Sequence, residues 1–131
     1  KPLAGAEGWQ LSNPPILQLA ALRASLEIFD EAGMPRLRQK STRLTGYLAF
    51  LLRTIEDERI SMITPPDVSG RGCQISIRVT DTGRKLFEAL TENGVIADWR
   101  EPDVIRVAPV PLYNSFSEVY RFYEILRSAL R

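Results

Sequence analysis

The sequence contains no histidine and a single cysteine, Cys73, among its 131 residues. Histidine is the commonest general base and metal ligand, so this chain alone cannot form a Ser-His-Asp triad, a Cys-His dyad or a histidine-containing zinc site. A lone cysteine also excludes an internal disulfide, which is typical of a reducing compartment. Because Cys73 begins an alternating apolar stretch, we expect a small core residue there and not a nucleophile.

Long apolar runs and a large excess of one charge are also absent. No stretch approaches the roughly eighteen apolar residues that a membrane-spanning helix requires, and the first residues do not resemble a secretory signal. The 17 basic and 16 acidic residues leave a net charge of +1, which predicts neither a nucleic-acid partner nor a membrane partner. We therefore expect a soluble, cytoplasmic protein with one compact core.

The first half of the chain predicts two long helices. Apolar side chains recur at helical spacing over residues 14–31, where Gly33 can end the helix, and again over residues 35–56. Asn13 precedes two prolines, which favour the first helical positions, so Asn13 is expected to cap the first helix. Residues 1–12 show no such period and are expected to continue from a preceding segment.

The second half predicts strands and two further helices. The alternating stretches RISMITP and GCQISIRV predict two antiparallel strands, followed by a short helix that Asn93 and Gly94 end. VIADW and VIRVAP predict a hairpin joined by the turn REPD, before a last helix capped by Asn114 or Ser115. The order ααββαββα predicts an α+β fold, a two-layer domain whose helices pack on one face of a small, mainly antiparallel sheet.

Arg106 is the first candidate for a functional residue. The strand period places it on the face opposite Ile105 and Val107. It could simply be an exposed strand arginine, but the apolar stretch APVPLYNS that follows is stiffened by two prolines and would hold its guanidinium in place. A fixed guanidinium suits a substrate carboxylate. Asp98 is expected to pair with a nearby arginine.

The second candidate is the start of the first helix. Simple capping by Asn13 is one interpretation of SNPP. The other is an anion site, because the prolines would fix free amide groups and the helix dipole toward a phosphate or carboxylate. Trp9 and Trp99 are expected to be packing groups.

Five segments resemble the C-terminal part of kynureninase, a pyridoxal-phosphate enzyme of fold type I, the aspartate-aminotransferase type. They are GWQLSNPPILQLAALRASLEIF, LTGYLAFLL, ITPPD, RGCQISI and NGVIADWREPDVIRVAPVPLYNSFSEVYRF. The resemblance covers essentially the whole chain. It implies that residues 1–12 lead in from a missing large N-terminal cofactor domain, and that residues 13–131 form the small C-terminal domain of a homodimeric enzyme.

The resemblance also implies an activity. Kynureninases hydrolyse the Cβ–Cγ bond of L-kynurenine, or of its 3-hydroxy form, to anthranilate or 3-hydroxyanthranilate and L-alanine, in tryptophan catabolism and NAD biosynthesis. Arg106 would bind the substrate α-carboxylate, and Asn13 would lie at the cofactor and the aromatic end of the substrate, with Ser12 as its neighbour. The residues that bind pyridoxal phosphate covalently and hold its ring and phosphate belong to the large domain, so the chain alone is expected to be inactive.

Two other function classes fit the residues. A free-standing domain could bind an amino acid through Arg106 and the first helix N-terminus without any chemistry. Alternatively, an interaction domain could use the first two helices as a dimer surface.

Overall fold

The computed structural model describes residues 1, 3–81 and 83–131, and it divides the chain into two compact units. The first unit is Lys1–Met34 and the second is Pro35–Arg131. The core described below is formed within the second unit. Within the described residues, no helix has the length and apolar character needed to cross a membrane.

The first unit contains a short 3-10 helix, η1 (Ala6–Trp9), and the helix α1 (Ile16–Ala32). Gly33 ends α1 as predicted, with a φ of 79° and its N–H bonded to the carbonyl of Phe29 at 2.8 Å. The prediction that Asn13 caps this helix was wrong, because Pro15 occupies the N-cap position and no side chain caps the helix. Pro15 disfavours helical backbone geometry at Pro14, so the helix begins only at Ile16 and Asn13 lies two residues before the N-cap position.

No residue of α1 is buried. Its apolar side chains, several of them on the predicted stripe, are 45–83% exposed: Ile16, Leu17, Leu19, Leu22, Leu26 and Ile28. Trp9 is also exposed, so the expectation that it packs is not met.

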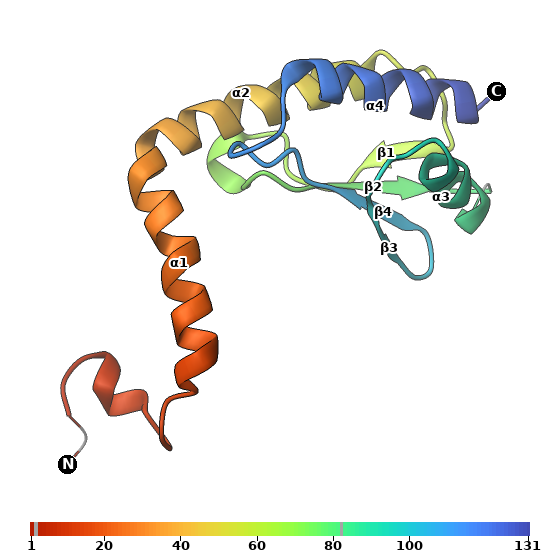
Figure 1. Ribbon diagram of the computed structural model, residues 1–131. Coiled ribbons are helices and arrows are strands. Elements are labelled where there is room, and N and C mark those ends of the chain that lie inside the picture. Colours follow the sequence, from red (N-terminus) through yellow and green to blue (C-terminus); the bar gives the residue numbers. More distant parts are fainter. Residues whose placement is uncertain (2, 82) are drawn as a thin grey trace. The chain divides into compact units, whose positions relative to one another are not determined.

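The second unit has the predicted element order. Its elements are α2 (Met34–Arg53, which starts one residue before the unit boundary), β1 (Ile60–Met62), η2 (Val68–Gly70), β2 (Ile75–Val79), α3 (Gly83–Glu92), β3 (Asp98–Arg100), β4 (Val104–Val107) and α4 (Phe116–Ala129). The four strands form one antiparallel sheet in the order β1-β2-β4-β3. Figure 1 shows α2 and α4 over one face of this sheet.

The core lies between the helices and that face. Alternate residues of the strands are buried, as the sequence pattern predicts. The main core residues are Leu44, Leu48, Leu51, Leu52, Ile75, Ile77, Val79, Leu86, Leu90, Ile105, Val107, Val119, Tyr123 and Leu126. Trp99 packs against this core and against Phe87, at 6.0 Å between ring centroids, which confirms its expected packing role. Cys73 is only half-buried, because β2 begins two residues after it.

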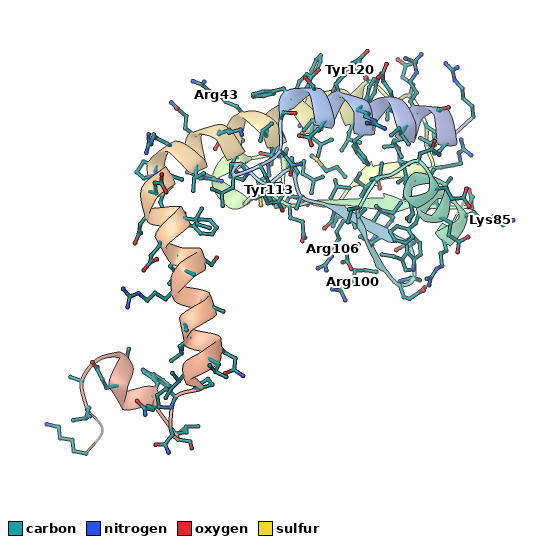
Figure 2. The ribbon with its side chains drawn as sticks, viewed as in Figure 1. Arg43, Lys85, Arg100, Arg106, Tyr113 and Tyr120 are labelled. Carbon is teal, nitrogen blue, oxygen red and sulfur yellow. The ribbon has the colours of Figure 1, made fainter. Side chains whose placement is uncertain are left out.

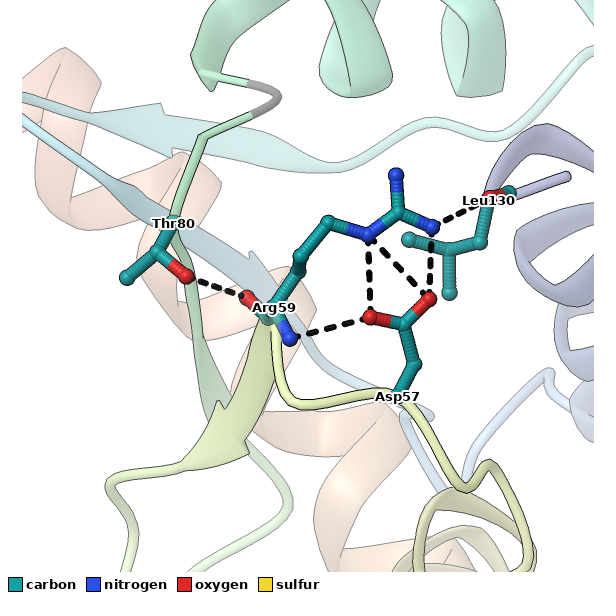
Figure 3. A network of polar contacts seen from close by, with 4 residues as sticks. All are labelled: Asp57, Arg59, Thr80 and Leu130. Carbon is teal, nitrogen blue, oxygen red and sulfur yellow. Dashed lines mark hydrogen bonds and ion pairs between the residues drawn. The ribbon is translucent and has the colours of Figure 1, made fainter.

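Polar contacts fix the ends of several elements. Ser115 caps α4 in a capping box with Glu118, which confirms one of the two predicted caps. Near the other end of α4, Arg59 donates to the carbonyl oxygen of Leu130 and pairs with Asp57 through Nη2 and Oδ2 at 2.6 Å. This network, drawn in Figure 3, ties the start of β1 to the end of α4.

Candidate substrate-carboxylate site

Arg106 lies on the face of the sheet that the helices leave open. Its register partners are Ser76 on β2 and Asp98 on β3. Ile105 and Val107 are buried on the opposite face, which confirms the predicted alternation. Figure 2 shows the side chains of Arg100 and Arg106 extending from the sheet on the side away from α2 and α4. The guanidinium therefore faces outward while its strand is anchored by the core.

The guanidinium of Arg106 has an acid partner within the chain. Its Nε donates to Oδ2 of Asp98 at 2.6 Å, and Nη2 contacts the same oxygen. The hydrogen bond from Arg106 lowers the pKa of Asp98, and the charge of nearby Arg100 lowers it further. The prediction that Asp98 pairs with a nearby arginine is confirmed, and the carboxylate remains ionised at neutral pH.

Asp98 is shared between two arginines. Nε of Arg100 donates to the same Oδ2 at 2.9 Å. Two positive charges and one negative charge thus leave this cluster with a net charge of +1. On the same face, Arg78 and Asp103 form a separate pair at 3.5 Å. The cluster of Asp98, Arg100 and Arg106 can therefore bind one monoanionic group such as a carboxylate.

The segment after β4 is held by its own hydrogen bonds. The N–H of Val110 donates to Oδ1 of Asn114 at 2.8 Å, and the N–H of Asn114 returns to the carbonyl oxygen of Val110 at 2.8 Å. Two prolines, Pro109 and Pro111, restrict the same segment. The loop is therefore rigid, but the contacts that hold the guanidinium of Arg106 come from Asp98, and among the described contacts none comes from this loop.

A cavity of about 450 Å³ lies beside this loop. It is lined mainly by apolar side chains, with polar groups from Asn114, Glu118 and Arg121. Arg106 does not line it. Sequence reasoning missed this cavity because its walls come from segments as distant as Leu48 and Ile125.

Sequence reasoning also missed a second arginine cluster. Arg71, in the motif RGCQ, is buried, and its Nη1 donates to the carbonyl oxygens of Pro65 and Pro66 at 3.0 and 2.9 Å. Arg38 of α2 donates to the carbonyl oxygen of Arg71 at 2.9 Å. The two arginines thereby attach the loop before β2 to α2, and an arginine between two glycines was the only sequence signal.

Ser12 and Asn13 belong to the first unit and are exposed. Their placement near a cofactor and near the substrate ring stays a prediction. The Pro-rich start of α1 has no further feature that points to a bound anion.

The described residues do not by themselves fit pyridoxal phosphate. Of the three lysines, Lys1 and Lys85 are exposed and Lys40 is half-buried. No lysine lines the cavity beside the loop or the smaller cavity of about 190 Å³ next to β1. Within the described residues, a cradle with a lysine for this cofactor is therefore not formed.

A family profile and similar curated proteins agree on one family. Residues 37–126 match the family profile described as "Kynureninase C-terminal domain". The kynureninase of Koribacter versatilis is 58% identical over 123 residues, which are 94% of this chain and 29% of that protein. The kynureninase of Myxococcus xanthus is 57% identical over 129 residues, 98% of this chain and 30% of that protein.

A solved structure extends the comparison to the fold. A chain titled "NifS-like protein" superposes with a TM-score of 0.74 over 99% of this chain and 39% of its own length. Its sequence identity is 17%, so this likeness concerns the fold alone.

Proposed function

The chain belongs to the kynureninase family as a C-terminal domain, and from this premise we propose that it supplies the substrate-carboxylate site of a complete kynureninase. The chain spans about 30% of the length of the curated relatives that it matches. The proposed reaction is hydrolysis of the Cβ–Cγ bond of L-kynurenine, or of its 3-hydroxy form, which releases L-alanine and anthranilate or 3-hydroxyanthranilate.

One observation carries this proposal. Arg106 stands on the open face of the sheet with its Nε and Nη2 on Asp98, and within the described residues its Nη1 makes no hydrogen bond or ion pair. A guanidinium held on one side can still offer donors to a carboxylate on the other. The α-carboxylate is the part of an amino-acid substrate that fits such a site. Fixing it orients the rest of the substrate for reaction.

Ser12 and Asn13 are proposed to complete the site. In this proposal the amide of Asn13 lies between the cofactor and the aromatic ring of the substrate, and Ser12 lies beside it. Both side chains can donate and accept hydrogen bonds, which suits the carbonyl and amino groups of a kynurenine ring.

The complete enzyme is proposed to use pyridoxal phosphate, which would supply an electron sink for the negative charge left on the amino-acid side when the Cβ–Cγ bond breaks. The lysine that binds this cofactor is proposed to lie in a large N-terminal domain. A cytoplasmic homodimer is the proposed form of that enzyme.

The test is a direct assay of a complete kynureninase that carries this domain. We expect release of anthranilate and L-alanine from L-kynurenine, detected by anthranilate fluorescence. The 131-residue chain alone, with added pyridoxal phosphate, is expected to release none, because the lysine that binds the cofactor is proposed to lie in the large N-terminal domain. Turnover by the isolated chain would contradict the proposed division of roles.

The same assay separates the alternative of an amino-acid-binding module. A complete protein carrying such a module would bind L-kynurenine in a calorimeter but would release no anthranilate. Absorbance of the complete protein near 420 nm separates the two classes as well, since a binding module needs no cofactor.

A further inference from the structure

Asp98 has a place in the carboxylate site that goes beyond neutralising one charge. A single oxygen, Oδ2, accepts from Nε of Arg106 at 2.6 Å and from Nε of Arg100 at 2.9 Å. The contact with Nη2 of Arg106 places Asp98 along one edge of that guanidinium. A guanidinium is planar and rigid, so a partner on one edge fixes the direction in which the other edge points.

The backbone below Asp98 is well anchored. Asp98 pairs in register with Arg106 across the antiparallel β3–β4 ladder. The next residue, Trp99, points to the core side, where its ring packs on Phe87 and its Nε1 donates to Glu101 at 2.8 Å. Asp98 therefore acts from a fixed strand position and not from a mobile loop.

We propose that Asp98 is a positioning and specificity-determining residue of this site: it orients Arg106 toward one substrate carboxylate and keeps Arg100 from binding a second one. This inference rests on the proposed role of Arg106. The net charge of the cluster supports the specificity role, because Asp98, Arg100 and Arg106 together carry +1, which matches one carboxylate. Without the charge of Asp98 the same cluster carries +2 and offers two guanidinium groups, which matches a dicarboxylate.

The variant Asp98→Asn in a complete kynureninase tests this proposal. The amide keeps the size of the side chain and removes its charge. We expect kcat for L-kynurenine to fall about tenfold while KM changes less than about twofold, because attraction for the carboxylate persists and its orientation is lost. A purely structural role would not produce this division between kcat and KM.

The specificity arm compares L-glutamate and L-glutamine as competitive inhibitors, because they have nearly the same shape and differ by one carboxylate. We expect Asp98→Asn to strengthen inhibition by L-glutamate at least about tenfold relative to L-glutamine. The double variant Asp98→Asn, Arg100→Gln should lose this gain, since the second guanidinium is then absent. The matched control Asp103→Asn removes a carboxylate that pairs with Arg78, and it should leave the inhibition ratio unchanged.

The outcomes separate this inference from the proposed function. If Arg106→Ala retains normal kcat/KM, the proposed carboxylate site itself is wrong, and the role of Asp98 falls with it. If Arg106→Ala is impaired while Asp98→Asn leaves kcat and the inhibition ratio unchanged, only the inference about Asp98 is overturned. An equal shift in Asp103→Asn would also overturn it, because the effect would then come from the general field of the sheet.

A measurement on the 131-residue chain adds a readout without catalysis. The Nε–H protons of Arg100 and Arg106 both donate to Asp98, and in NMR spectra they should exchange with water faster in Asp98→Asn than in the parent chain. Unchanged exchange, or an Asp98→Asn chain that has lost its folded spectrum, would show that Asp98 does not hold the two arginines as proposed.

Discussion

Truncation of Arg106 is the perturbation that tests the site most directly. In Arg106→Ala, made in a complete kynureninase that carries this domain, the substrate loses its partner for the α-carboxylate. Removing one member of a desolvated charged pair costs about 2 to 4 kcal/mol, which corresponds to a fall in kcat/KM of roughly 30-fold to 900-fold. We expect KM to rise and kcat to fall together, because the same contact binds the substrate and orients it.

The structure also predicts that the fold survives this truncation. Arg106 lies on the face opposite the core, and its partner Asp98 is half exposed and keeps Arg100 at 2.9 Å. No buried charge is therefore left without a partner. Far-ultraviolet circular dichroism and the absorbance of the bound cofactor should match those of the parent enzyme.

Arg106→Lys separates geometry from charge. Lysine preserves the positive charge, but it presents a point charge in place of two parallel donors, so it cannot hold Asp98 on one edge and a carboxylate on another. The fall in kcat/KM should be smaller than for Arg106→Ala and still clear in steady-state kinetics. Near-normal kcat/KM in Arg106→Ala would refute the reasoning, as would an unfolded Arg106→Ala enzyme, which would mean that the arginine serves the fold.

Three further predictions concern the isolated chain. It should self-associate, because the leucines of α1 are exposed, and size-exclusion chromatography with light scattering would detect this. The double variant Leu22→Gln, Leu26→Gln should be monomeric, whereas a parent chain that is already monomeric would contradict the prediction. Leu90→Ala should lower the free energy of unfolding, measured in urea, by about 2 to 5 kcal/mol, since Leu90 is fully buried. A loss below about 1 kcal/mol would contradict this prediction, because it would mean that neighbouring side chains fill the space that Leu90 occupied. Arg59 lowers the pKa of Asp57 from 3.8 to about 2 through hydrogen bonds, so the stability that this pair contributes is fully present above the unfolded pKa of Asp57 and is lost as the pH falls through about 2. The urea midpoint should therefore fall less at acid pH in Asp57→Asn than in the parent chain. Equal falls would show that this pair does not contribute to the acid sensitivity of the fold.

The parts of the fold that local pattern controls could be predicted from the sequence. The strand alternation around Ile75 and Ile105 gave the buried face correctly, because a period of two sends every second side chain to the core. The end of α1 was also correct, since Gly33 can adopt the positive φ that the helix end requires. The predicted cap at Asn13 was wrong because a proline disfavours helical geometry at the residue before it, so α1 begins after Pro15 and not at Pro14.

The features that depend on distant segments could not be predicted. Asp98 was expected to pair with some arginine, but its pairing with both Arg100 and Arg106 follows from the register of β3 against β4. The cavity beside the loop after β4 requires walls from α2 and α4 at once. Neither arrangement leaves a periodic signal in the sequence, because each is set by tertiary packing.

The proposed carboxylate site and the proposed aromatic site differ in how they depend on the rest of an enzyme. Arg106, Asp98 and Arg100 all lie in the second unit and within residues 37–126, the part that matches the family profile. Their mutual geometry is set by one strand pair, so it is complete in this chain. Ser12 and Asn13 lie in the first unit and outside that match, so their proposed roles depend on how a complete enzyme places them. Arg106 variants consequently test a preformed site, whereas Asn13 variants test an assembled one, and only the Asn13 variants should lose their effect on ligand binding when the isolated chain is studied.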